Sequence, residues 1–243
     1  MNVPSLVLLT LILSVPGAHA QAQTINVVTE ATSHSFLEGG KVVGAATQVV
    51  QKSLKAAGLN DFRISLYPWA RSYDMALQEP NVLIYLIART PAREQQFKWA
   101  GEIMRIKFHL YKLKDRQVKV DSLMDAGRFR VGVLRDDVGH QYLKEQGFTR
   151  LVVSAEQLDN FRKLLSGQVD LVPLPEEDTT SLCKEANFSC DNLEKGYTLD
   201  EMSTGMYMAY SRLTPDIVVE KTKVAFEKLR ASGIVKTLME KKQ

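Results

Sequence analysis

The chain lacks the features that mark nucleic-acid-binding and membrane-spanning proteins. It carries 31 Lys and Arg against 28 Asp and Glu, a formal net charge of +3, and no basic run is interleaved with aromatic residues. Nucleic acid is therefore not an expected partner. After residue 20 no apolar stretch reaches the roughly 20 residues that a membrane-spanning helix needs.

Motifs of metal binding and catalysis are also lacking. The sequence contains no G-x-S-x-G, no H-E-x-x-H and no glycine-rich loop of the kind that holds phosphate. The three histidines after residue 20, His34, His109 and His140, do not follow metal-ligand spacing and are interpreted as surface or packed residues. We therefore expect no metal site and no cofactor.

The first 20 residues have the pattern of a secretory signal peptide. Residues 7–15 form an apolar core, and Ala18-His19-Ala20 is a small-x-small cleavage site, although no Lys or Arg precedes the core. No cysteine follows that site, so a lipid anchor is not expected. Cleavage would leave 243 − 20 = 223 residues, enough for one large domain or two small ones.

The chain has only two cysteines, Cys183 and Cys190. In an exported protein such a pair more often forms a disulfide than a metal site, and no histidine lies nearby to complete a zinc site. The disulfide would stabilise the fold by about 2–3 kcal/mol on the loop-entropy model. Two unpaired thiols are the alternative.

The apolar pattern predicts two successive β-α-β-α-β units, hence an α/β fold with largely parallel sheets and right-handed crossovers. In the first unit we expect strands at 24–29, 62–66 and 81–88, and helices at 42–57 and 72–78. In the second unit a strand at 107–114 and a helical turn at 120–126 precede strands at 129–134, 151–153 and 169–174.

Helices in the second unit are expected after Asp136 and after Ser154, with Ser154 and Gln157 forming a capping box. A closing strand is expected at 205–211, then a helix started by Thr214-Pro215 and helical turns at 234–241.

One segment points to a ligand. The buried-type strand at 82–87 ends in Ala88-Arg89-Thr90-Pro91-Ala92-Arg93. Ligands of open α/β folds bind beyond the carboxyl ends of strands. The guanidinium group of arginine grips carboxylate or phosphate with two parallel hydrogen bonds. Arg89, Thr90 and Arg93 are therefore predicted to bind a small anionic or zwitterionic solute.

Four segments in order resemble the periplasmic solute-binding proteins of amino-acid-type ABC transporters, which are the bacterial extracellular solute-binding protein family 3. Thr90 to Arg93 followed by Phe97 resembles the T-x-E-R…F segment of that family, and the strand from Arg128 to Val133 resembles its kvGV strand. Ser166 to Asp170 resembles its G-x-v-D turn, and the tail from Met206 to Gly233 resembles its closing strand and helices. The chain looks like a divergent branch.

The resemblance implies a type II periplasmic binding protein fold with two lobes joined by two hinge strands and a ligand cleft between them. Each lobe would be a mostly parallel sheet flanked by helices. Lobe 1 would comprise 24–106 and 198–243, and lobe 2 would comprise 107–197. By its place in the motif, Arg93 would hold a ligand carboxylate, with Ala88 and Thr90 beside it. A structural ion pair is the alternative role for Arg93.

The chain also departs from the pattern of the family. Pro175 stands where an acidic residue usually holds the ammonium of the ligand, with Glu176 and Glu177 just beyond. The usual Gly-Thr contact to the ligand carboxylate is replaced by Arg135-Asp136-Asp137-Val138-Gly139. A standard α-amino acid is therefore a less secure expectation than a solute with a carboxylate or similar anion.

Further candidates for the ligand site lie at the ends of predicted elements. They are Arg71, Trp69, Glu30 and Asp136. Arg71 has a surface ion pair as its alternative role, Trp69 core packing, and Glu30 solvation. Of Asp136 and Asp137, one is expected to cap the helix and the other to meet a cationic part of the ligand.

Three functions fit this sequence. The first is a non-enzymatic periplasmic receptor, monomeric, that delivers an amino acid or related carboxylate to the membrane permease of an ABC transporter. The second is a sensory receptor that signals to a membrane partner. The third is a periplasmic dehydratase-type enzyme, for which Glu30, Asp136 or Glu176 would act as acid or base.

Overall fold

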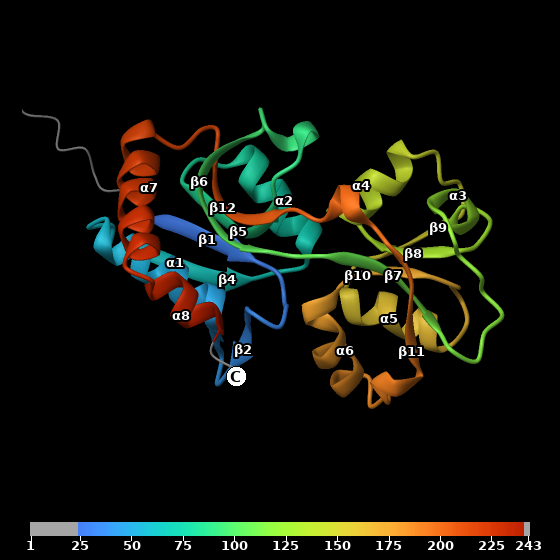
Figure 1. The fold of residues 1–243 in the computed structure, drawn as a ribbon. Helices are drawn as coiled ribbons and strands as arrows, with labels where there is room; N and C mark the ends of the chain where they lie inside the picture. Colours follow the sequence, from blue (N-terminus) through green and yellow to red (C-terminus); the bar gives the residue numbers. More distant parts are fainter. Residues whose placement is uncertain (1–23, 241–243) are drawn as a thin grey trace, which may run out of the picture.

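The computed structural model describes residues 24–240. The predicted signal peptide, residues 1–20, and the predicted helical residue Lys241 lie outside the described residues. The chain forms two lobes side by side, and two connections pass between them (Figure 1). The predicted fold class is confirmed.

Five strands form the sheet of the first lobe, in the order β4-β1-β5-β12-β6. The three strands predicted at the start of the chain pair in parallel, whereas β12 is antiparallel to both β5 and β6. Two of the four pairings are therefore parallel and two antiparallel, because β12 alone runs opposite to the other four strands. The bounds are β1 (Ile25–Thr29), β4 (Phe62–Leu66), β5 (Val82–Ala88), β6 (Phe97–Arg105) and β12 (Gly205–Ser211).

Helices cover both faces of this sheet, and β5 explains why. All seven residues of β5 are buried. Successive residues of a strand face opposite sides of the sheet, and here helices cover both sides. Leu83 and Tyr85 pack with α1, α7 and α8, whereas Val82 and Ile84 pack with α2. The bounds are α1 (Ala45–Ala56), α2 (Trp69–Gln78), α7 (Asp216–Ala231) and α8 (Ile234–Glu240).

Helix α1 begins later than its apolar spacing predicted. Val42 and Val43 belong to β3 (Lys41–Val43), which pairs with β2 (Phe36–Glu38) in a hairpin. Both turn residues, Gly39 and Gly40, have positive φ, which glycine adopts without steric cost. The prediction of a helix from residue 42 was wrong because two valines that suit a helical face suit a strand equally well.

The second lobe contains two small sheets that meet through a bridge between Val131 and Leu171. Strands β8 and β9 pair in parallel, whereas β7 pairs antiparallel with β10 and β11. The bounds are β7 (Phe108–Leu113), β8 (Val131–Leu134), β9 (Leu151–Ser154), β10 (Val172–Pro175) and β11 (Leu193–Thr198). The helices are α3 (Leu123–Ala126), α4 (Val138–Glu145), α5 (Gln157–Leu165) and α6 (Thr179–Glu185).

Two helix starts differ from the predicted caps. The N-cap of α5 is Glu156 without a side-chain bond, because Ser154 ends β9 and its hydroxyl accepts a hydrogen bond from Lys163 Nζ at 2.8 Å. The predicted capping box of Ser154 and Gln157 was therefore wrong. Helix α7 begins after Pro215 without a side-chain cap, and the Thr214 hydroxyl instead accepts from the backbone N–H of Asn81.

Strands β6 and β11 were not predicted from the sequence, yet they lead into the two connections between the lobes. Strand β6 ends at Arg105 and β7 begins at Phe108 in the other lobe. Strand β11 returns to β12 through the short helix η4 (Asp200–Met202). Neither strand alternates strictly between apolar and polar residues, which hid them from a period-of-two pattern.

The predicted disulfide is present, and it links α6 to the short helix η3 (Cys190–Asn192). The Cα atoms of Cys183 and Cys190 are 5.6 Å apart. The bond pins the end of α6 beside the lobe core, where Cys183 is 3% exposed.

Among the described helices, none has the length and apolar character needed to cross a membrane.

Candidate functional site

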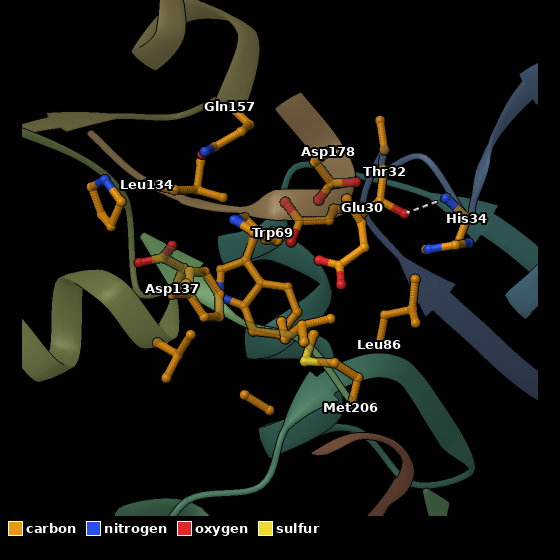
Figure 2. Close-up of a pocket in the computed structure, with 18 of the residues that line it drawn as sticks. Glu30, Thr32, His34, Trp69, Leu86, Leu134, Asp137, Gln157, Asp178 and Met206 are labelled. Atoms are coloured by element: carbon orange, nitrogen blue, oxygen red, sulfur yellow. Dashed lines mark hydrogen bonds between the residues drawn. The ribbon is translucent and has the colours of Figure 1, made fainter. Parts of the chain in front are cut away.

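A cavity lies where the two lobes meet, and both lobes supply its walls. The first lobe contributes Glu30 and His34 after β1, Trp69 at the start of α2, and Arg93 after β5. The second lobe contributes residues that follow β8 and β10, among them Asp137 and Asp178 (Figure 2). The cavity volume of about 80 Å³ suits a small solute.

The apolar part of the wall comes from both lobes. Its residues include Leu86, Met104, Phe108, Leu134, Pro173 and Met206. An apolar lining with a few convergent polar groups is the usual composition of a small-molecule site.

The charged part of the wall is acidic. The carboxylates are those of Glu30, Asp137, Glu177 and Asp178, and Arg93 is the one cation that lines this cavity in residues 24–240. The sequence predicts Arg93 at the site and assigns the helix cap and the ligand contact to separate aspartates, whereas the acids outnumber the arginine in the wall.

Glu30 follows the last residue of β1, and its carboxylate faces the cavity (Figure 2). Within residues 24–240 this carboxylate accepts no hydrogen bond, and only its backbone oxygen is bonded, by Thr29 and Ser35. Burial raises the pKa of Glu30 well above its ordinary value, and the nearby carboxylates of Asp137 and Asp178 raise it further. Glu30 is thus an acid without a countercharge in bonding distance.

Asp137 both starts a helix and lines the cavity. Its Oδ1 atom accepts a hydrogen bond from the backbone N–H of His140 at 2.6 Å, which caps α4. Burial raises the pKa of Asp137 to about 7, although the backbone bonds from His140 and Gly139 oppose this rise. The sequence offered two neighbouring aspartates, and the structure gives the cap and the cavity position to the same one.

Arg93 is buried at 1% exposure, and its nitrogens are bonded within the protein. Nε donates to Gln141 Oε1 at 3.1 Å, Nη1 to the carbonyl of Ala88 at 3.3 Å, and Nη2 to the carbonyl of Asp136 at 3.2 Å. The guanidinium also lies over the ring of Tyr73, 4.9 Å from its centroid. Arg93 therefore holds the two lobes together, because its partners come from both.

Three hydrogen bonds converge on the backbone carbonyl of Asp136 at one side of the cavity. It accepts hydrogen bonds from Trp69 Nε1 at 2.9 Å, from Arg93, and from Gln141 Nε2 at 3.1 Å. Asp136 has φ of +59°, and this left-handed backbone turns its carbonyl toward the first lobe. Its carboxylate is 53% exposed and does not line the cavity.

Asp178 bridges the lobes at the other side of the cavity. Its Oδ1 atom accepts hydrogen bonds from the backbone N–H of Ser33 at 2.9 Å and from the Ser33 hydroxyl at 2.6 Å. Asp178 lies in the short helix η2 (Glu176–Asp178), directly after β10. The acidic run 176–178 was visible in the sequence, but nothing local indicated which of its members would turn inward.

Two polar atoms at the cavity have no hydrogen-bond partner within the described residues. They are His34 Nε2 and Gln157 Oε1, and both atoms are buried. Burial lowers the pKa of His34, so its ring is neutral at pH 7. Neither residue was predicted, because a lone histidine and a helix-start glutamine carry no motif.

The remaining predicted residues do not line the cavity. Arg89 pairs with Glu94 at 2.5 Å and lies over the rings of Trp99 and Tyr207. The guanidinium of Arg71 lies over the ring of Tyr67, 4.1 Å from its centroid, and the backbone carbonyl of Thr90 accepts a hydrogen bond from the backbone N–H of Arg93.

Of the seven predicted ligand residues, the cavity wall includes Glu30, Trp69 and Arg93. Their ligand contacts remain predictions.

A search of residues 24–240 gives no cluster of three or more His, Cys, Asp or Glu side chains placed to hold a metal ion. The acidic groups of the cavity are spread around its wall.

No protein-family model matches this chain, and no curated protein matches its sequence. Solved structures do match. A histidine kinase sensor domain with similarity to periplasmic binding proteins aligns with a TM-score of 0.78 at 18% identity, over 89% of this chain and 94% of that one. An ancestral arginine-binding protein bound to arginine aligns with a TM-score of 0.77 at 18% identity, over 91% and 98%.

A third match is the arginine-, lysine-, histidine-binding protein ArtJ from Geobacillus stearothermophilus. It aligns with a TM-score of 0.75 at 18% identity, over 89% of this chain and 93% of that protein. The identities are low, so these likenesses establish the fold. The chain has the two-lobe α/β fold of type II periplasmic binding proteins.

Proposed function

We propose that this chain is an exported binding protein that encloses a small polar solute between its two lobes. The observation that carries the proposal is the cavity walled by both lobes, with interlobe hydrogen bonds at Asp136 and at Asp178 on its two sides. A ligand in such a site contacts both lobes only when they are closed, so binding and closure are coupled. We place the lobe limits at 24–106 with 198–243, and at 107–197.

The signal-peptide pattern supports export to the periplasm through cleavage after residue 20. There the protein would act as a monomer and deliver its solute to the membrane permease of an ABC transporter. Structural likeness to amino-acid-binding proteins of such transporters supports this role. The residues that we propose to contact or shape the ligand are Glu30, Trp69, Arg93, Asp137, Gln157 and Asp178.

The likeness to a histidine kinase sensor domain favours a second role, in which closure is passed to a membrane signalling partner. Deletion of the gene separates the two roles. Loss of uptake of the solute would support transport, whereas intact uptake with loss of a solute-dependent response would support sensing.

We do not propose an enzyme. The raised pKa of Glu30 is a property that a general acid also needs. Asp136 and Glu176, however, have carboxylates that are 53% and 51% exposed, and Glu176 pairs with Lys195. Incubation with small carboxylic acids that can undergo dehydration or elimination tests this point, and turnover that is lost in Glu30→Gln would overturn the binding-only proposal.

The test of solute binding is native mass spectrometry of protein purified from the periplasm, followed by a thermal-shift panel of amino acids, amines and small organic acids. A co-purifying mass and a raised melting temperature with the same compound are expected. If no compound in the panel shifts the melting temperature and no mass co-purifies, the proposed function is wrong.

A further inference from the structure

The cavity has a surplus of acidic side chains for a site that the sequence predicts to bind an anion. Four carboxylates line it against one guanidinium, a formal surplus of three negative charges, and the ring of His34 is neutral at pH 7. A buried charge is costly unless it is paired. The wall therefore has too few cationic groups to pair with its acids.

Both groups that would hold a ligand carboxylate are already bonded within the protein. The guanidinium of Arg93 donates to Gln141, Ala88 and Asp136. The N-terminus of α4, whose free N–H groups attract anions, is capped by the carboxylate of Asp137. A ligand carboxylate would have to displace one of these contacts and would also face the remaining acids.

Besides the ring nitrogen His34 Nε2, the cavity groups without a hydrogen-bond partner in residues 24–240 are acceptors. The carboxylate of Glu30 accepts no hydrogen bond from residues 24–240, and Gln157 Oε1 is a buried acceptor that is also unpaired there. An ammonium or guanidinium group offers only donors, so it complements such a wall. The indole of Trp69 and the apolar wall beside it would pack against a short hydrocarbon body.

We propose that the cavity binds a small organic cation that has an amine or guanidinium group, a short apolar body and no carboxylate. The inference rests on the proposed solute-binding function and names the ligand class for the same site. Glu30 would form an ion pair with the cation, and Gln157 and Asp178 would lie in the cavity wall around the bound cation.

The proposal predicts a pH dependence of a definite sign. Glu30 is faced by Asp137 from α4, Asp178 from η2, Glu156 beside α5 and Arg93 from the short helix η1 (Pro91–Arg93). Burial and the three acids raise the pKa of Glu30, whereas Arg93 lowers it. A bound cation favours the ionised carboxylate, so binding releases a proton and affinity rises as pH rises toward the raised pKa of Glu30. One released proton gives up to about a tenfold change per pH unit.

Matched pairs of ligands test the proposal by isothermal titration calorimetry. Agmatine is compared with L-arginine, and 1,5-diaminopentane with L-lysine, since the members of each pair differ only in the carboxylate. We expect each amine to bind at least tenfold more tightly than its amino acid, and more tightly at pH 8 than at pH 5.5. Glu30→Gln should weaken amine binding at least tenfold, whereas Glu38→Gln on the exposed strand β2 should not.

The other outcomes distinguish failure of the cation proposal, of the site assignment and of the proposed function. Tighter binding of the amino acids, or of a simple carboxylate such as butyrate, overturns the cation proposal and leaves solute binding intact. Amine binding that is unchanged in a folded Glu30→Gln variant overturns the site assignment. If none of the amines, amino acids or carboxylates binds, the proposed solute-binding function fails as well.

Discussion

At the scale of single residues, Asp137 shows how one side chain can serve the fold and the site together. Its carboxylate caps α4 and also lines the cavity, where burial raises its pKa to about 7 against an ordinary value of 3.8. The folded protein therefore holds a proton that the unfolded chain has already released over this range. Because the folded state binds more protons, stability falls as pH rises from about 4 to about 7.

Replacing Asp137 by Asn should remove this dependence, because asparagine caps a helix comparably well and has no charge to bury. The melting temperature of Asp137→Asn without ligand should exceed that of the wild type by a margin that grows from pH 5 to pH 8. The margin should widen by roughly 2–4 °C for each kcal/mol that the buried charge costs. Circular dichroism melts at four pH values measure it.

Asp136→Asn is the matched control, since Asp136 is the neighbouring aspartate with an exposed carboxylate. Its melting temperature should follow that of the wild type across the same pH range. A constant offset between Asp137→Asn and the wild type at every pH would contradict the explanation.

At the scale of elements, the corner between β3 and α1 is held by a glycine. Gly44 has φ of +122°, and a Cβ there would lie 2.2 Å from the carbonyl oxygen of His34, a residue of the cavity wall. Gly58, at the other end of α1, has φ of +73° and open space around it. Both glycines have positive φ, but Gly44, with φ of 122° and ψ of 166°, also lies in a region that essentially only glycine adopts.

Alanine substitution at both positions compares an open site with one that is both crowded and restricted to glycine. Gly58→Ala should destabilise the protein by about 1–2 kcal/mol from backbone strain alone. Gly44→Ala should cost roughly a further 1–3 kcal/mol, because the corner must shift to make room. Urea unfolding measures both, and equal costs for the two variants would refute the crowding argument.

The disulfide stabilises a single element of the second lobe. It joins two cysteines seven positions apart, one in α6 and one in η3. Removing it in the Cys183→Ala, Cys190→Ala double variant should lower the free energy of unfolding by about 2–3 kcal/mol. Addition of dithiothreitol to the wild type should lower the melting temperature similarly, and dithiothreitol should have no effect on the double variant.

At the scale of the whole molecule, closure depends on a few hydrogen bonds between the lobes. Ser33 donates twice to Asp178 on one side of the cavity, and Trp69 and Arg93 donate to the carbonyl of Asp136 on the other. Arg93 also donates to Gln141 of the second lobe, and two connections between the lobes can act as hinges. The balance between open and closed forms should therefore respond to single side chains.

The Ser33→Ala variant tests this balance without a ligand. Loss of the hydroxyl bond to a carboxylate should shift the population toward the open form, which raises the radius of gyration measured by small-angle X-ray scattering. Ser166→Ala is the control, because the Ser166 hydroxyl bonds only within the second lobe, to the carbonyl of Lys163. Identical scattering from both variants would show that Ser33 does not hold the lobes closed.

The sequence by itself determined the fold class, the disulfide, and the strand end that carries Arg93, because hydrophobic period, cysteine spacing and a short motif are local signals. The sequence did not predict β6 and β11, because the burial of these two strands depends on antiparallel partners that are distant in the chain. The tertiary structure alone decided the charge of the cavity. Glu30, Asp137 and Asp178 come from segments far apart in sequence and meet only through lobe packing. The same packing directs Arg93 to protein carbonyls and leaves the carboxylate of Glu30 unpaired within residues 24–240.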